Sequence, residues 1–211
     1  MIVFEHICLV FLWMLFCIQH SVFATAWWKQ KMFILLGRSF RYYRFFYSFF
    51  AFLNLVLLLY FQFAINSPAL WKVSGLLQLT SLATGLSGLV IMLSCIRKYF
   101  SVVTGIKAFA REKNQVAILQ TGGLHKYTRH PLYFGTLVFI WSFFLLFPLV
   151  NNLIACGVIS VYTLVGIHIE ERKLINEFGE SYKLYTRRVP RLIPRFPGRR
   201  HKLGQSFQET I

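Results

Sequence analysis

Long apolar segments constrain this chain more than any other feature of its sequence. A helix needs about 20 mostly apolar residues to cross a bilayer core of about 30 Å. Three segments meet this requirement: Ile2 to Phe23, Phe45 to Ile65 and Leu76 to Ile96. With 56% hydrophobic residues and a mean hydropathy of +0.56, the chain has the composition of a membrane protein and too little polar surface for a soluble fold.

A further apolar region, from Leu132 to Ile169, is too long for one span. Pro148, Asn151 and Asn152 interrupt it near the middle, which favours a tight turn there. We therefore predict a helical hairpin whose spans are Leu132 to Leu149 and Leu153 to Ile169. The expected fold is all-α, a single integral membrane domain over residues 1–211 with five transmembrane helices.

The basic residues test this division independently. The chain has 23 Lys and Arg against 7 Asp and Glu, a formal net charge of +16. With five spans, every Lys and Arg except Lys72 falls on one side of the membrane, in segments 24–44, 97–131 and 170–211. The positive-inside rule then predicts an N-terminus outside and a C-terminus in the cytoplasm. Because membrane topology accounts for these charges, we expect no nucleic-acid partner.

The cysteines and the N-terminus fit the same class of protein. Cys8, Cys17, Cys95 and Cys156 lie in apolar runs without the short spacing of a metal site, so we expect buried apolar side chains and no metal. The first apolar stretch lacks a basic n-region and a small-residue cleavage site. This predicts a retained span instead of a cleaved signal peptide.

Beyond the fifth span, apolar residues recur at helical spacing among charged ones. From Glu170 to about Arg188 this pattern predicts an amphipathic helix at the membrane interface, with Gly179 as a candidate break. We expect segment 170–195 to lie under the cytoplasmic ends of the spans and to contribute to a binding site. Residues 197–211 predict a flexible basic tail attracted to anionic lipid.

A polar cluster stands where the fourth span begins. Pro131 suits the first helical turn, where an N–H is not needed, and this leaves Arg129 and His130 at the N-terminal cap with Tyr133 just inside. Free backbone amides, the positive helix end and Arg129 together form a site for a carboxylate or a phosphate. The alternative is that Arg129 and Tyr133 are interfacial anchors and His130 is a surface residue.

Glu170 and Glu171 follow the fifth span directly, where acidic side chains are costly without partners. Because the last two spans form a hairpin, Arg129 and His130 can meet these carboxylates in one pocket. A pocket with a cationic end, an acidic end and aromatic residues suits a zwitterionic amino acid attached to a nucleoside. S-adenosylmethionine is one candidate among several, and a purely structural Arg–Glu pair is the alternative.

Two blocks of the sequence resemble a known family. The first is GGLHKYTRHPLYFG, from Gly122 to Gly135; the second begins with Glu170 and Glu171 and continues through FGxxYxxY and VPRLIP to Pro194. In this order, separated by one hairpin, they resemble the integral-membrane methyltransferases related to isoprenylcysteine carboxyl methyltransferase and phospholipid N-methyltransferases. The resemblance covers about the C-terminal 80 residues.

The resemblance implies transfer of a methyl group from S-adenosylmethionine at the membrane interface. It implies cofactor-binding roles for eight residues: Leu124, Tyr127, Arg129, His130, Tyr133, Gly135, Glu170 and Glu171. Of these, we assign catalytic roles to Arg129 and Glu171. We expect Tyr182 and Tyr185 to contact the methyl acceptor.

The N-terminal half is similar to one branch of these proteins. The segment Gln19 to Ala24, followed by Lys29 and Arg44-x-x-Tyr47, resembles the methanethiol S-methyltransferases and nurim-like proteins. His20 and Ser21 either shape the acceptor site or form a polar pair at a helix end. Segment 97–109 has no acidic residue where that branch leads us to expect one, which weakens the case for a small thiol acceptor.

Methyl transfer from a sulfonium requires alignment and exclusion of water, without a metal or a covalent nucleophile. The acceptor stays open among isoprenylcysteine carboxylate, a small thiol, a phospholipid amine and another amphiphile. Two other functions compete: an NADPH-dependent membrane reductase of the same superfamily, and a non-catalytic membrane scaffold. We predict a multi-pass membrane methyltransferase whose active site faces the cytoplasm, with a lipophilic acceptor entering from the bilayer.

Overall fold

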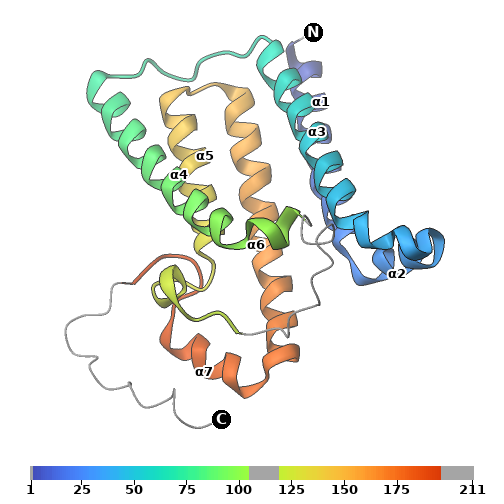
Figure 1. Ribbon diagram of the computed structural model, residues 1–211. Helices are drawn as coiled ribbons and strands as arrows, with labels where there is room; N and C mark the ends of the chain where they lie inside the picture. The colour runs from blue at the N-terminus through green and yellow to red at the C-terminus, as the bar shows by residue number, and fades with distance from the viewer. Residues whose placement is uncertain (1, 105–118, 196–211) are drawn as a thin grey trace.

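The protein is a bundle of long helices with short helices at one end (Figure 1). The computed structural model describes residues 2–104 and 119–195, without the side chains of 98–104. In these ranges there is no strand, and the elements are α1 Ile2–Ala24, α2 Ala26–Leu36, the 3-10 helix η1 Gly37–Tyr42, α3 Tyr43–Ala64, α4 Gly75–Thr104, the 3-10 helix η3 Gly123–Lys126, α5 Pro131–Leu146, α6 Val150–Phe178 and α7 Glu180–Arg188. The predicted tail, 197–211, lies outside them.

Among the described residues, four helical stretches are long and apolar enough to cross a membrane: Ile2–Ala24, Ala26–Ala64, Gly75–Arg97 and Val150–Phe178. Within Ala26–Ala64, α3 supplies the span, because η1 and the positive φ of Gly37 separate it from α2. The remaining expected span, the fourth along the chain, is α5, a shorter apolar helix of 16 residues. The all-α class is confirmed, and the protein is a multi-pass membrane protein.

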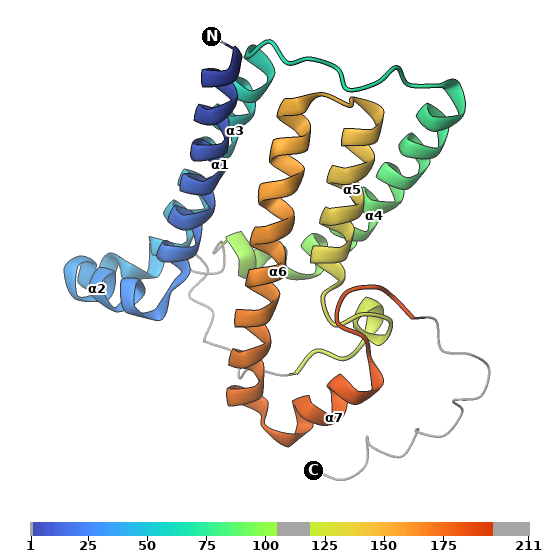
Figure 2. The ribbon, with the colours of Figure 1, turned by 180° about the vertical axis from the view of Figure 1, so that it is seen from behind.

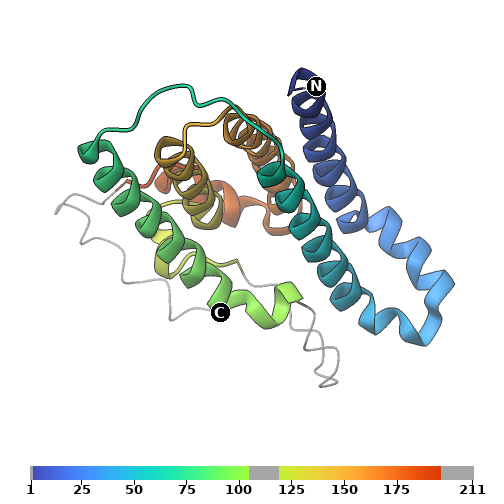
Figure 3. The same cartoon turned by 90° about the horizontal axis from the view of Figure 1, so that it is seen from above.

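α5 and α6 pack against each other, as the predicted hairpin requires. Seen along the bundle, α1 and α3 lie on one side, α4 and α5 on the other, and α6 between the two pairs (Figure 3). The turn between α5 and α6 lies at the same end as the N-terminus and the segment from α3 to α4 (Figures 1 and 2). α2, the start of α5 and α7 lie at the other end, which we call the basic end.

Two elements differ from the sequence-based expectation. α6 does not end at Ile169: it runs to Phe178, and the positive φ of 55° at Gly179 then separates it from α7. The prediction was wrong because hydropathy shows only where the apolar part of the helix ends. The backbone hydrogen bonds of α6 continue beyond that point into the polar residues. Its 29 residues correspond to about 44 Å at 1.5 Å per residue, which exceeds the bilayer core. Segment 24–44, expected as a connection, contains the helix α2.

Buried polar side chains join the helices near the opposite end. Trp13 Nε1 donates to Gln62 Oε1 at 2.9 Å, and Gln62 Nε2 donates to Asn152 Oδ1 at 2.9 Å. Asn151 Nδ2 donates to the backbone oxygen of Gln62 at 2.7 Å. The two asparagines that predicted the hairpin turn therefore lie in the first turn of α6, where they bind α3 and, through Gln62, α1.

Glycines bring α4 and α5 into close contact. A Cβ atom on Gly88 would lie 2.8 Å from the backbone nitrogen of Phe139 and 2.9 Å from the backbone oxygen of Gly135. A Cβ atom on Gly135 would lie 3.0 Å from the backbone oxygen of Gly88. Small residues at such crossings are the usual means of close packing between helices in membranes. The position of α5, and of the polar residues that begin it, depends on this contact.

We predict that Gly88→Ala destabilises the protein by about 1–3 kcal/mol, because the added methyl group meets backbone atoms that move only with the helix. The measurement is unfolding in detergent, followed by circular dichroism. Gly157→Ala in α6 is the control: a Cβ there meets no atom within 4 Å, so stability should be unchanged or slightly higher. Equal stability of the two variants would contradict the packing described.

Candidate functional site

The segment before α5 is held by the chain that follows α7. Arg129 N donates to Pro190 O at 2.9 Å, and Arg195 N donates to Tyr127 O at 3.0 Å. The buried Thr128 hydroxyl donates to Leu192 O at 2.9 Å. The C-terminal VPRLIP block therefore has a structural role: it pairs with the residues that precede α5.

Arg129 and Glu171 form a buried ion pair between the start of α5 and α6. Arg129 Nε and NH2 lie 2.7 Å and 2.5 Å from Glu171 Oε1, and the two side chains are 9% and 8% exposed. Arg129 NH1 also donates to the backbone oxygens of Thr186 and Val189, at 3.0 Å and 2.9 Å. One guanidinium therefore links α5, α6 and the end of α7, a geometry that suits the planar fork of arginine.

Glu171 keeps its charge in this environment. Burial favours the neutral form of its carboxyl, but the hydrogen bond and charge of Arg129 outweigh burial, and Arg191 adds to them. The pKa of Glu171 is therefore lowered. Arg191 NH2 lies 2.8 Å from Glu171 Oε2, so each carboxylate oxygen has a cationic partner. This group lies beyond Ile169, where the apolar part of α6 ends.

His130 is buried between the two glutamates. Its Nε2 lies 3.4 Å from Glu171 Oε1, and its Nδ1 lies 3.7 Å from Glu170 Oε2. Burial lowers the pKa of His130, and the nearby carboxylates oppose this only in part. The imidazole is therefore neutral at pH 7, with a nitrogen able to accept a proton.

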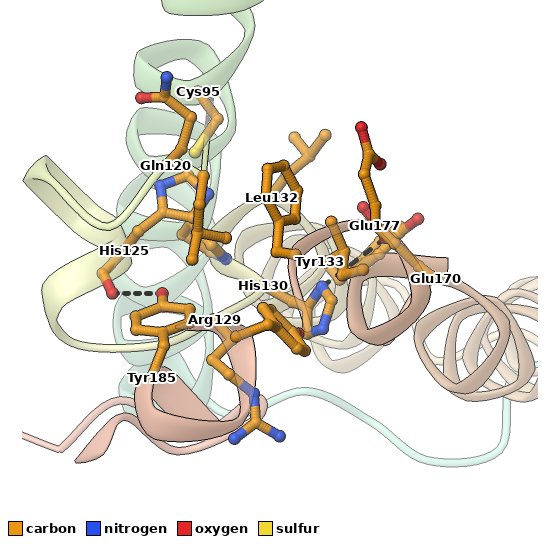
Figure 4. Close-up of a pocket in the computed structure, with 15 residues that line it drawn as sticks. Cys95, Gln120, His125, Arg129, His130, Leu132, Tyr133, Glu170, Glu177 and Tyr185 are labelled. Carbon is orange, nitrogen blue, oxygen red and sulfur yellow. Dashed lines mark hydrogen bonds and ion pairs between the residues drawn. The ribbon is translucent and has the colours of Figure 1, made fainter. Parts of the chain in front are cut away.

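A cavity of about 400 Å³ opens beside this cluster (Figure 4). One wall is polar and the rest largely apolar and aromatic; the lining residues are Cys95, Leu119, Gln120, His125, Arg129, His130, Pro131, Leu132, Tyr133, Glu170, Leu174, Glu177, Phe178, Tyr182 and Tyr185. Tyr185 closes one side by donating from its hydroxyl to His125 O at 2.6 Å. The guanidinium of Arg129 lies at the edge of the group, away from Cys95 and Gln120 (Figure 4).

Tyr182 contributes a buried hydroxyl beside the ion pair. The residue is 1% exposed, and its hydroxyl makes no well-formed hydrogen bond to any residue in the described ranges. Burial, and next the charge of Glu171, raise its pKa to about 12, so it is a neutral donor at physiological pH. The hydroxyl does interact with the Glu171 carboxylate, so Tyr182 connects the cavity lining to the ion pair behind it.

Six residues named from the sequence line the cavity: Arg129, His130, Tyr133, Glu170, Tyr182 and Tyr185. Glu171 lies behind them, in the ion pair with Arg129. Leu124 and Tyr127 belong to η3 and its C-cap, outside the lining, and Gly135 packs against α4.

The sequence analysis did not name several lining residues. Leu174, Glu177 and Phe178 lie four, seven and eight positions after Glu170, and this helical spacing would have identified them once α6 was extended past Ile169. Cys95 carries no such signal, because only the packing of α4 against α5 brings it to the cavity, and Gln120 stands before η3 without a recognisable pattern.

His20 and Ser21 lie in a separate polar cluster. The hydroxyl of Tyr47 is 2.9 Å from His20 Nδ1, and Ser21 Oγ donates to Tyr162 Oη at 3.1 Å. This cluster joins α1 to α3 and α6 near the basic end, and none of its four residues lines the cavity.

Comparisons with known proteins identify the family of this chain. The model of the NnrU protein family matches residues 8–198. The chain belongs to this family. It is 31% identical to methanethiol S-methyltransferase 1 of Bradyrhizobium diazoefficiens, over 85% of the chain and 64% of that protein. It is also 31% identical to methanethiol S-methyltransferase 2 of the same organism, over 88% of the chain and 72% of that protein.

A second group of relatives matches a shorter part of the chain. Protein-S-isoprenylcysteine O-methyltransferase of Schizosaccharomyces pombe is 36% identical over 42% of the chain and 38% of that protein. No solved structure matches the chain. The resemblance predicted from the two C-terminal blocks is confirmed, and the methanethiol S-methyltransferases extend it over most of the chain, although this chain spans only about two thirds of the length of the first of them. Segment 97–109, whose lack of acidic residues suggested a departure, lies almost wholly outside the described side chains.

We predict that Arg129→Lys destabilises the basic end by about 1–3 kcal/mol, because one ammonium cannot reach Glu171 and the two backbone oxygens together. Trypsin should cleave the variant faster within residues 187–195, which follow the lost contacts. Arg172→Lys, at an exposed position of α6, is the control. Cleavage at the wild-type rate would show that Arg129 does not hold this segment.

Proposed function

We propose that the protein is a methyltransferase that uses S-adenosylmethionine and acts at the membrane interface. The observation that carries the proposal is the cavity between α5, α6 and α7, which combines a helix N-terminus, two carboxylates and several aromatic rings. The named relatives, which are methyltransferases, support it. A second support is the arrangement of the RHPLYFG and Glu-Glu blocks around this one cavity.

The lining fits the cofactor's chemical groups. A volume of about 400 Å³ lies within the range of small-molecule sites. The first-turn amides of α5, at Leu132 and Tyr133, have no partner within the helix and suit the carboxylate of the methionine moiety. Glu170 and Glu177 suit its ammonium group. Aromatic faces favour the sulfonium.

The residues divide into binding and positioning roles. Glu170, Tyr133 and Tyr182 line the cavity and would contact the cofactor. The donors of Arg129 are directed to Glu171 and the end of α7, so we assign the Arg129–Glu171 pair a positioning role. It holds the start of α5, α6 and α7 around the cavity.

When bound, S-adenosylmethionine supplies an electrophilic methyl group. The chain contributes alignment of the acceptor and exclusion of water. A thiol acceptor must lose a proton, whereas a carboxylate need not. His130 and Glu170 lie at the cavity wall and are the groups placed to accept that proton. A requirement for proton transfer to one of these two side chains would distinguish a thiol-methylating enzyme from a carboxyl-methylating one.

The distribution of Lys and Arg residues indicates how the protein is oriented in the membrane. All basic residues except Lys72 lie in segments that the five-span topology puts on one side. The start of α5 and α7, which contribute lining residues to the cavity, lie at the basic end (Figure 2). We assign this end to the cytoplasm by the positive-inside rule, with the N-terminus outside. A soluble cofactor then enters from the cytoplasm and a lipophilic acceptor from the bilayer.

The test supplies methyl-tritiated S-adenosylmethionine to membranes that contain the protein. We expect label in one extracted fraction, which names the acceptor class: volatile for a small thiol, lipid or protein for the others. Glu170→Gln should lower the rate and the affinity for the cofactor at least about tenfold, because a charge-assisted hydrogen bond is lost. Glu180→Gln, which removes an exposed pair with Lys183, should change neither.

Two outcomes would contradict the proposal. Absence of cofactor binding by calorimetry, together with absence of label in every fraction, would favour a scaffold. Oxidation of NADPH in the presence of a lipid enone would favour the reductase.

A further inference from the structure

A second cavity lies between α1 and α3. Its volume is about 210 Å³, and it shares no lining residue with the cavity described above. Apolar side chains of segments 12–16 and 57–61 form most of its wall, together with the side-chain amides of Gln19 and Asn54. In the part of the chain that the structure describes, α1 and α3 form one edge of the bundle (Figure 3).

This cavity opens toward lipid. Its inner wall includes Leu58, which is 7% exposed and belongs to the core cluster with Leu9 and Trp13. Its outer part includes Leu15 and Leu57, which are 47% and 58% exposed. Exposed apolar side chains in the spans of a membrane protein face acyl chains, so a molecule reaches this cavity from the bilayer.

The two amides lack the partners that other polar side chains of these helices have. The buried Gln62, for example, accepts from Trp13 Nε1 at 2.9 Å. Within the described ranges, the side chain of Gln19 makes no hydrogen bond, and Asn54 Nδ2 donates to Phe50 O of its own helix at 2.8 Å. The whole amide of Gln19 and the oxygen of Asn54 are therefore available to a ligand.

Both amides lie within the spans. Gln19 precedes the end of α1 at Ala24 by about 7 Å along the helix, and Asn54 follows the start of α3 at Tyr43 by about 16 Å. Acyl chains offer no hydrogen-bonding group at this depth, so unpaired amides are unfavourable there. A ligand that supplies the missing hydrogen bonds would remove this cost.

The lining indicates the chemistry of that ligand. It contains no ionisable side chain, so it offers no counter-charge to an ionic head group. A hydroxyl both donates and accepts, as each amide does, so one hydroxyl can bind both amides. Leu12 and Phe61 lie about 10 Å further along the two helices, which leaves an apolar wall for a hydrocarbon chain. A helix of a second copy is about 10 Å wide and too thick to enter this cavity.

We propose that Gln19 and Asn54 bind the hydroxyl of an uncharged long-chain lipid whose hydrocarbon chain lies between α1 and α3, toward Leu12 and Phe61. The amides lie at the side of the cavity nearer the basic end, so the chain runs toward the bilayer centre, as in a lipid of the leaflet at that end. This site is independent of the methyl-transfer proposal.

The experiment measures equilibrium binding of tritiated oleyl alcohol to the full chain in detergent by scintillation proximity. We expect saturable binding that unlabelled oleyl alcohol displaces. 1-Octadecene has a chain of the same length without the hydroxyl, and oleate has a charged head group, so both should compete at least about tenfold more weakly.

Variants of the amides test the site itself. Gln19→Leu and Asn54→Leu should each lower the affinity for oleyl alcohol about fivefold, because each removes one hydrogen bond of ordinary strength. Leu15→Trp keeps both amides and fills the cavity from its exposed side, so it should lower the affinity by at least about tenfold. Because Leu15 is exposed, this change should not alter the helical circular dichroism or the unfolding in detergent.

Gln78→Leu is the matched control. Gln78 is an exposed amide on α4 that lines neither cavity, so the variant should bind oleyl alcohol as the wild type does. Equal loss of binding in this variant would show that the assay reports general changes of the membrane surface and would contradict the proposed site.

Three further results would overturn the proposal. These are absence of saturable binding, displacement by 1-octadecene or oleate as effective as that by oleyl alcohol, and wild-type affinity in both leucine variants. A dimer in analytical ultracentrifugation that Gln19→Leu dissociates, without binding of the alcohol, would instead identify a second copy of the chain as the partner of these amides.

Discussion

The buried pair of Arg129 with Glu171 is the interaction on which the polar end of this protein depends. Removing two charges from water is costly, and the pair is stable only if further hydrogen bonds satisfy both partners. Here the guanidinium also binds the backbone oxygens of Thr186 and Val189, and the carboxylate also binds Arg191. The start of α5, the end of α6 and the segment after α7 are therefore joined at one point, and the cavity lies beside it.

The apolar bundle determines where that point lies. Gly88 and Gly135 let α4 and α5 approach until their backbones touch, and this contact places the first turn of α5. Gln62 and Asn152 join α3 to α6 at the far end. Neither contact involves a residue that lines the cavity, but the first fixes the position of α5 and the second that of α6, and both helices contribute to the lining. The long extension of α6 past the apolar region then carries Glu170 and Glu171 to the partners that precede α5.

Much of this arrangement follows from the sequence. Apolar length predicts the helices, and Pro148 with the two asparagines predicts the hairpin. The hairpin in turn predicts that Arg129 and Glu171 meet, as they do. The remaining features depend on tertiary contacts that local patterns do not report. Thr128 lies in the first recognised block, but only the structure shows that its hydroxyl binds the backbone oxygens of Arg191 and Leu192. Gly135 belongs to the recognisable block, but its neighbour Gly88 shows that it packs against α4.

The helix α2 shows a different limit of sequence reasoning. Its charges were assigned to a connecting segment because hydropathy averages over Lys29 and Lys31 and hides the apolar residues before and after them. The structure separates these properties: Trp27, Phe33, Ile34 and Leu35 are exposed on α2, which projects from α1 and α3 at the basic end (Figure 1).

The account's central claim is that the cavity between α5, α6 and α7 holds S-adenosylmethionine. The most direct measurement is ultraviolet crosslinking of the tritiated cofactor to the full chain in detergent, followed by peptide mapping. The account predicts label on peptides that carry Tyr133, Tyr182 or Tyr185, all of which line the cavity, and loss of that label with excess S-adenosylhomocysteine. Label confined to α1 or α3, or label that the competitor does not reduce, would contradict it.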